Sequence, residues 1–230
     1  MKTIGIIGGF GPETTAKFLM LLISLWQKKN PEKRPEILLW NAPVNNNIER
    51  EFISSGKNAD KFLPLLKTGA KKLEKAGADF LVLPCNSLHI FIEDIKNSVN
   101  IPVLNIMEET TKFLVKKRVS KIGLFGTTIT NSSHIFDSFL EKHKIEIIRP
   151  NQKDQTKLNH LIHNLIIGKR LNGDLKNFIH LVKKTKLSGT KNILLACTDL
   201  QLLSIKMRNI NFIDTLDILA KATVEKMLKQ

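Results

Sequence analysis

The sequence predicts an α/β protein made of two similar halves, each with a doubly wound parallel sheet, and a site between them. Three observations support this prediction. Short apolar runs alternate with amphipathic stretches along the chain, the pattern of parallel strands covered by helices. Segment 3–9 is echoed by segment 121–127. Each half also has one of the two cysteines of the chain at the end of an apolar run.

The apolar runs predict the strands, and the amphipathic stretches between them predict the helices. Turns are expected at prolines and glycines, such as Pro102, Pro150 and Gly189. The predicted strands span 3–7, 37–41, 80–84, 103–106, 121–126, 145–149, 193–196 and 211–213. The predicted helices span 14–28, 60–75, 88–98, 108–116, 134–142, 157–168, 173–186 and 216–228.

The echo divides the chain near residue 107. We expect one domain over 1–106 plus 214–230, with Cys85, and a second over 107–213, with Cys197. Ligands bind at the carboxyl ends of parallel strands, and both cysteines follow predicted strands at such ends. Two thiols that face one pocket would allow proton transfer on both faces of a carbon centre. The pair therefore predicts a racemase or isomerase that needs no cofactor.

Composition narrows the class of protein. The 230 residues are 42% hydrophobic and have a formal net charge of +15. The lysines are dispersed, so we interpret the charge as a solvated surface and expect no nucleic-acid partner. The most apolar early stretch, 18–26, is shorter than the ~20 residues that a bilayer requires, so we expect no membrane association. Because Met1 leads directly into a strand pattern, we expect a cytoplasmic protein with reduced thiols.

Two other patterns are candidate ligand sites. The loop 8–15 is rich in glycine but has neither dinucleotide-fingerprint spacing nor a Walker lysine-serine pair. We expect it to form an anion-friendly wall of the pocket, with no cofactor. His160 and His163 have a spacing that can chelate a metal, but no third ligand accompanies them, so we expect no metal.

Several motifs, taken in order, resemble the aspartate/glutamate racemase family, whose members do not use pyridoxal phosphate. The resemblance covers essentially the whole chain. The motifs are Gly8-Gly9-Phe10-Gly11-Pro12, Pro84-Cys85-Asn86-Ser87-Leu88-His89, Gly123-Leu124-Phe125-Gly126-Thr127-Thr128, Ala196-Cys197-Thr198-Asp199-Leu200 and Asp214-Thr215.

The resemblance implies catalysis by two cysteines. One of Cys85 and Cys197, as a thiolate, would remove the α-proton, and the other, as a thiol, would protonate the opposite face. A free thiol has a pKa of ~8.5, so its surroundings must favour the thiolate. Donors must also stabilise the charge that develops on the α-carboxylate. The candidate donors are Asn86, Ser87, Thr127 and Thr198, and the resemblance places Phe10 beside them at the pocket wall.

Structural roles compete with these functional ones. A single buried cysteine at a strand end is usually a small core residue, and only the matched contexts and the motifs favour catalysis. Asn86 and Thr198 are equally suited to cap the helices that follow them. His89 would either orient Cys85 or simply pack, and Asp199 would position a neighbour or cap a helix.

The substrate is less well defined by the sequence. Family members strict for acidic amino acids have a basic residue near Arg50, and a lysine where this chain has Ile166, with Lys169 three residues later. Our first choice is a small anionic amino acid, aspartate or glutamate, with Arg50 as a binding residue. The alternatives are a racemase of broader specificity, a maleate- or hydantoin-type isomerase, and a binding module that has lost catalysis. The resemblance also implies a homodimer.

Overall fold

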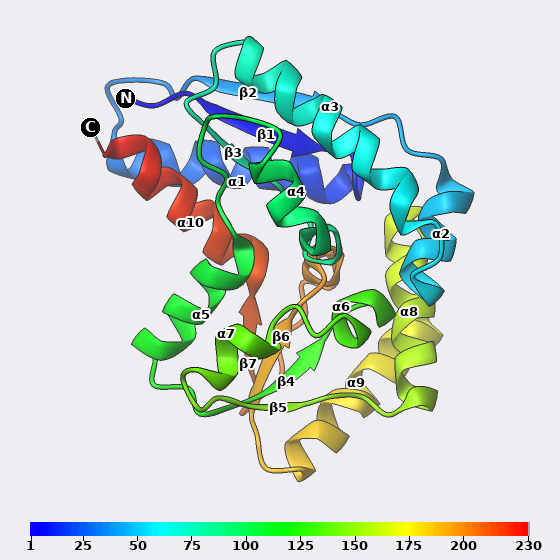
Figure 1. The fold of residues 1–230 in the computed structure, drawn as a ribbon. Helices are drawn as coiled ribbons and strands as arrows, with labels where there is room; N and C mark the ends of the chain where they lie inside the picture. Colours follow the sequence, from blue (N-terminus) through cyan, green and yellow to red (C-terminus); the bar gives the residue numbers. More distant parts are fainter. Residues whose placement is uncertain (230) are drawn as a thin grey trace.

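The computed structural model describes residues 1–229, apart from the Asn46 side chain, and contains two parallel sheets (Figure 1). In the first sheet, β1 (Ile4–Gly8) lies between β2 (Ile37–Asn41) and β3 (Phe80–Val82). The second sheet has the order β5-β4-β6-β7, and all its paired strands are parallel. These strands are β4 (Lys121–Phe125), β5 (Glu146–Ile148), β6 (Asn192–Leu195) and β7 (Asn211–Asp214). The predicted α/β class with two parallel sheets is confirmed.

The two sheets share one arrangement at their centres. β1 and β4, the strands of the sequence echo, each have neighbours on both sides. One neighbour of the central strand leads to a cysteine, and this neighbour is β3 in the first sheet and β6 in the second. Cys85 and Cys197 follow these two strands, so the cysteines occupy equivalent places in the two halves.

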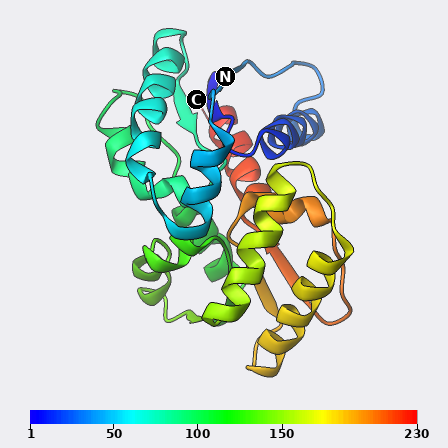
Figure 2. The same ribbon diagram turned by 90° about the vertical axis from the view of Figure 1, so that its right-hand side faces the viewer.

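Helices cover the sheets on both faces (Figures 1 and 2). In chain order, the helices before β4 are α1 (Pro12–Lys29), α2 (Asn46–Ser55), η1 (Ala59–Lys61), α3 (Phe62–Lys75), η2 (Ser87–Phe91), α4 (Ile92–Lys96) and α5 (Ile106–Lys116). The helices after β4 are α6 (Thr128–Ser132), α7 (Asp137–Glu141), α8 (Gln152–Ile166), α9 (Asn172–Leu187), η3 (Thr198–Leu203) and α10 (Thr215–Leu228).

The last helix returns to the first half of the chain. α10 packs against α1 and α5, and the Lys2 N–H donates to the Met227 carbonyl over 3.1 Å. The two termini lie close together in both views (Figures 1 and 2). This return is compatible with a first domain that ends in 214–230, although residue 230 lies outside the described residues. The division into 1–106 plus 214–230 and 107–213 stays a prediction.

One predicted strand is wrong, and one predicted helix is divided. Segment 103–106 contributes a single bridge, from Val103 to Leu81, because the Asn105 side chain accepts from the Met107 N–H and caps α5, which begins at Ile106. The predicted helix 88–98 consists of the short 3-10 helix η2 followed by α4. α2, α6 and η3 lie outside the predicted helices and strands.

The backbone at the start of the loop 8–15 explains why a glycine stands at position 9. Gly9 has a φ of +93°, and a Cβ atom there would lie 2.4 Å from the Ala42 backbone nitrogen. Because Ala42 follows β2, whose backbone is held in the sheet, this neighbour has little freedom to move. The glycine is therefore required by a close backbone approach.

We expect Gly9→Ala to lower the free energy of unfolding by at least about 2 kcal/mol, from backbone strain and the clash with Ala42. Gly77→Ala is the matched control, because Gly77 has a φ of +98° and its added Cβ meets no atom within 4 Å. Urea unfolding of both variants makes the comparison. If both variants lost the same free energy of unfolding, the clash with Ala42 would contribute nothing to the loss.

Candidate active site

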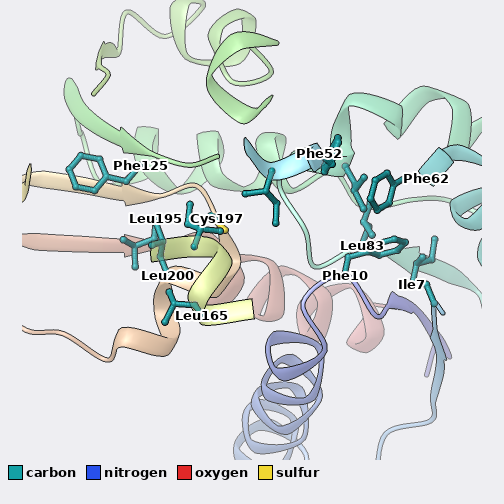
Figure 3. Close-up of a cluster of buried hydrophobic side chains, with 14 of the residues drawn as sticks. Ile7, Phe10, Phe52, Phe62, Leu83, Phe125, Leu165, Leu195, Cys197 and Leu200 are labelled. Atoms are coloured by element: carbon teal, nitrogen blue, oxygen red, sulfur yellow. The ribbon is translucent and has the colours of Figure 1, made fainter. Parts of the chain in front are cut away.

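A cavity lies between the two sheets and is lined by residues from both halves of the chain. Figure 3 shows Cys197 at the end of its strand, with Phe10, Phe52 and Phe62 on the side of the first sheet. Among the predicted site residues, those that line this cavity are Phe10, Cys85, Asn86, Ser87, Thr127, Cys197 and Thr198. The other lining residues are Glu49, Phe52, Ile53, Phe62, Leu88, Ile162, Ile166 and Asp199.

Both thiols are strongly desolvated. Burial, the main cause, together with the nearby Asp199 and Glu49 carboxylates, raises the pKa of Cys85 to about 12. Burial and Asp199 likewise raise the pKa of Cys197 well above its usual value. Both residues are therefore protonated at neutral pH before a ligand binds, and either one needs a proton acceptor or a positive charge to become a base.

Backbone N–H groups oppose this effect at each sulfur. The N–H groups of Leu88 and Ser87 hydrogen-bond to Cys85 and lower its pKa. The N–H groups of Asp199 and Leu200 do the same for Cys197. In both halves a short 3-10 helix begins within two residues of the cysteine, and its backbone N–H groups are the donors to the sulfur. The two loops thus offer the same means of stabilising a thiolate.

Hydrogen bonds between the halves hold the two cysteine loops together. The Thr198 hydroxyl donates to the Pro84 carbonyl over 3.1 Å. The Asn86 Nδ2 donates to Thr215 Oγ1 over 2.9 Å, and Thr215 Oγ1 donates to the Leu195 carbonyl over 2.8 Å. Neither Asn86 nor Thr198 caps a helix with its side chain, so the capping alternative is wrong. Both side chains instead fix the position of one thiol relative to the other.

Three hydroxyls form a second link across the cavity. Ser87 Oγ lies 2.8 Å from Thr127 Oγ1 and 3.0 Å from Thr130 Oγ1. The two threonine hydroxyls lie 3.0 Å apart. Ser87 belongs to the first cysteine loop, whereas both threonines follow β4 in the second half. The cluster places hydroxyl groups of both halves at one wall of the cavity.

Asp199 is bound to the thiol of its own loop. Its Oδ2 lies 3.8 Å from Cys197 Sγ, and its Oδ1 accepts from the Thr14 hydroxyl. Burial raises the pKa of Asp199 to about 6, and the two hydrogen bonds oppose that rise. Gly11 allows this approach, because a Cβ there would lie 2.6 Å from Oδ1. Asp199 is therefore a carboxylate within reach of a thiol proton at neutral pH.

Glu49 lines the cavity although it was not among the predicted site residues. It lies on α2 with 8% of its surface exposed, and it accepts a hydrogen bond from the Gly11 N–H. Burial, the main cause, and the charge of Asp199 raise its pKa from 4.5 to about 7. The missed helix hid this residue, although Asn45 and Gly56 are typical residues for the two ends of a helix.

The pKa of Glu49 predicts a pH-dependent stability difference. The folded protein binds the Glu49 proton more tightly than the unfolded chain. The contribution of this group to the free energy of unfolding is therefore fully present below pH 4.5 and is lost as the pH rises to about 7. We expect Glu49→Gln to be more stable than the wild type by up to about 3 kcal/mol at pH 8 and to lose that advantage near pH 4.5. Urea unfolding at both pH values measures it. Glu51→Gln, on the exposed side of α2, should show no such trend.

His89 supports the first cysteine loop. Its Nδ1 lies 2.7 Å from the Cys85 carbonyl oxygen, and its Nε2 accepts from the Ile106 N–H. These contacts fix the neutral tautomer that has its proton on Nδ1. Burial lowers the pKa of His89 to about 4. The residue joins the loop to the start of α5 and contributes no positive charge to Cys85 at neutral pH.

The predicted basic residues do not reach the cavity lining. Arg50 is exposed on α2 and lies near His163, and Lys169 is exposed after α8. Ile166, at the position where the resemblance suggests a lysine, lines the cavity. Among the described residues that line it there is no lysine, arginine or histidine, so the charged side chains of the lining are both carboxylates.

The described residues were also compared with what a metal site and a membrane-spanning helix require. Within residues 1–229, no group of three or more His, Cys, Asp or Glu side chains is placed to hold a metal ion. His160 instead lies 3.9 Å from an Asp174 carboxylate oxygen. No helix in residues 1–229 is long and apolar enough to cross a membrane.

Comparisons with known proteins agree with the motifs and the fold. Residues 7–223 match the family model described as Asp/Glu/hydantoin racemase. The broad-specificity amino-acid racemase RacX of Bacillus subtilis is 29% identical over an alignment of 239 residues, which covers 98% of each chain. The aspartate racemase of Picrophilus torridus has a similar structure, with a TM-score of 0.80, 26% identity, and coverage of 100% of this chain and 96% of that one.

An aspartate racemase homologue from Pyrococcus horikoshii has a TM-score of 0.77 and 28% identity, with both chains covered completely. The family match spans nearly all of the described chain, including both cysteine loops and the strands that position them. The protein therefore belongs to the Asp/Glu/hydantoin racemase family and is an amino-acid racemase.

Proposed function

We propose that this racemase interconverts L- and D-amino acids with Cys85 and Cys197 as its two bases, without a cofactor. The observation that supports the proposal most is the placement of both thiols at one cavity, on equivalent strands of two similar halves. Racemisation requires a base on one face of the α-carbon and an acid on the other. Two sulfurs from opposite halves meet this requirement more directly than one sulfur would.

The reaction exchanges the protonation states of the two sulfurs. One thiolate takes the α-proton and becomes a thiol, and the C–H electron pair passes into the α-carboxylate as an enolate-like charge. The other thiol then donates its proton to the opposite face of the α-carbon and becomes a thiolate. No atom or electron is gained or lost, so no oxidant, reductant or metal is required.

The loops supply what each sulfur needs. The N–H groups around Cys85 and Cys197 stabilise whichever sulfur is charged. Asp199, with a pKa of about 6, accepts the proton of the Cys197 thiol when that residue acts first as the base. The hydroxyls of Ser87 and Thr127 donate to the substrate α-carboxylate as charge develops there.

The lining favours a broader substrate range over the acidic amino acids of our first choice. Aspartate or glutamate would bring a second carboxylate next to Glu49 and Asp199, and the described lining has no cation to pair with it. The relative RacX is described as having broad specificity. We therefore propose an amino-acid racemase that is not restricted to aspartate and glutamate. The homodimer and the cytoplasmic location stay predictions.

A substrate panel in heavy water tests the proposal. The purified protein, without added cofactor, is incubated with L-aspartate, L-glutamate and neutral and basic L-amino acids, and α-deuteration and optical rotation are followed together. We expect deuterium at Cα in step with loss of optical rotation for several substrates. Exchange on no amino acid would refute the proposal and would favour maleate, a hydantoin or binding without catalysis.

A further inference from the structure

Two helices supply most of the apolar wall of the cavity. Phe52 and Ile53 lie on α2, and Ile162 and Ile166 lie one turn apart on α8. The two helices pack against each other although they come from different halves of the chain (Figure 2). A substrate side chain that enters this part of the cavity meets methyl, methylene and ring carbons.

Glu49 lies on the same face of α2 as this wall. It precedes Phe52 and Ile53 by three and four residues, the spacing of neighbours on one helix face. It is more than nine-tenths buried and lines the cavity. Within residues 1–229 it forms no ion pair, and its hydrogen bond comes from the Gly11 N–H. A buried carboxylate with this little compensation is costly for the fold, which points to a role with a ligand.

The other charged groups near the cavity do not offset Glu49. Asp199 has the same sign and is already bonded to Thr14 and Cys197. Arg50 and Lys169 are exposed and outside the lining. A cation brought in by the substrate would therefore be attracted, whereas a distal carboxylate would be repelled.

We propose that Glu49 determines specificity, by binding the cationic end of a lysine-, ornithine- or arginine-type side chain whose methylene groups pack on α2 and α8. This inference rests on the proposed racemase function and names its preferred substrate class. A long basic side chain matches both features of the wall, because its stem is apolar and its end is charged. A neutral side chain satisfies only the apolar part.

The test compares kcat/KM for L-lysine, L-ornithine, L-methionine and L-aspartate in the wild type and in Glu49→Gln. We expect the wild type to favour the two basic substrates. Glu49→Gln should lower their kcat/KM by about 10- to 100-fold, the usual effect of losing a charged hydrogen-bond partner. Methionine should change little, because its side chain has no charge, and aspartate should improve, because the repulsion between its distal carboxylate and Glu49 is removed.

Two further variants separate recognition from folding. Glu49→Asp retains the carboxylate and should restore part of the preference for basic substrates, whereas Glu51→Gln, on the exposed side of the same helix, should behave as the wild type. An equal loss for all four substrates would refute the inference, because it would assign Glu49 to the α-ammonium group that all amino acids share. A wild-type preference for aspartate would also refute it. Only exchange on no amino acid at all would refute the underlying function.

Discussion

Replacing either cysteine with serine is expected to lower racemisation by at least about 1,000-fold, because each variant lacks the acid or the base for one face of the α-carbon. Serine retains the size of the side chain, but its hydroxyl is far too weak an acid to replace a thiol. Cys197 is buried and Cys85 is half-buried, and their loops are tied together by Thr198 and Asn86, so another side chain has little room to take over. Optical rotation of a good substrate measures the loss.

The remaining thiol of each variant should still exchange one enantiomer. With only one face served, it can remove an α-proton and return a deuteron to the same side, which labels the substrate without inverting it. We expect Cys85→Ser to label one enantiomer and Cys197→Ser to label the other, as followed by mass spectrometry in heavy water. If either variant racemised at the wild-type rate, the two-thiol mechanism would be wrong.

Asp199→Asn is expected to lower kcat by about 10- to 100-fold, since asparagine cannot accept the Cys197 proton. It should also move the alkaline limb of the pH profile to lower pH. The charge on Asp199 raises the pKa of Cys197, so a neutral amide in its place lowers that pKa. Initial rates of racemisation between pH 5 and pH 10 measure both effects.

Asp217→Asn provides the control for this prediction. Asp217 is a surface carboxylate on α10 that pairs with Lys221, so its loss should leave the pH profile in place. A purely structural role of Asp199 would reduce the rate at every pH without moving the profile. That outcome would remove Asp199 from the proton path and leave it as a partner of Thr14.

The sequence predicted the central part of the fold because local signals and long-range packing agree there. β1 and β4 are buried apolar strands that repeat one motif, and such strands occupy the middle of a parallel sheet. The placement of Cys85 and Cys197 at one cavity follows from the same rule, since each follows the strand beside a central one. At these positions the spacing of the motifs was sufficient to predict where the residues lie in the fold.

The wall of the cavity could not be predicted in the same way. α2 is a ten-residue helix that packs against α8 from the other half, so its role depends on contacts distant in the sequence. Without α2 as a helix, Glu49 is one carboxylate beside Arg50, and the arginine is the more obvious ligand for an acidic substrate. The register of the helix reverses this choice, because it buries Glu49 and exposes Arg50.

The two cysteine loops differ at the second residue after the cysteine, and this difference has a kinetic consequence. Cys85 is followed after one residue by Ser87, whereas Cys197 is followed in the same way by Asp199. Enantiomers have equal free energies in solution, so the equilibrium constant is one, and the Haldane relation then requires the same kcat/KM from either enantiomer. The unlike neighbours of the two thiols can therefore alter kcat and KM only together, and an enantiomer that binds more tightly must turn over more slowly.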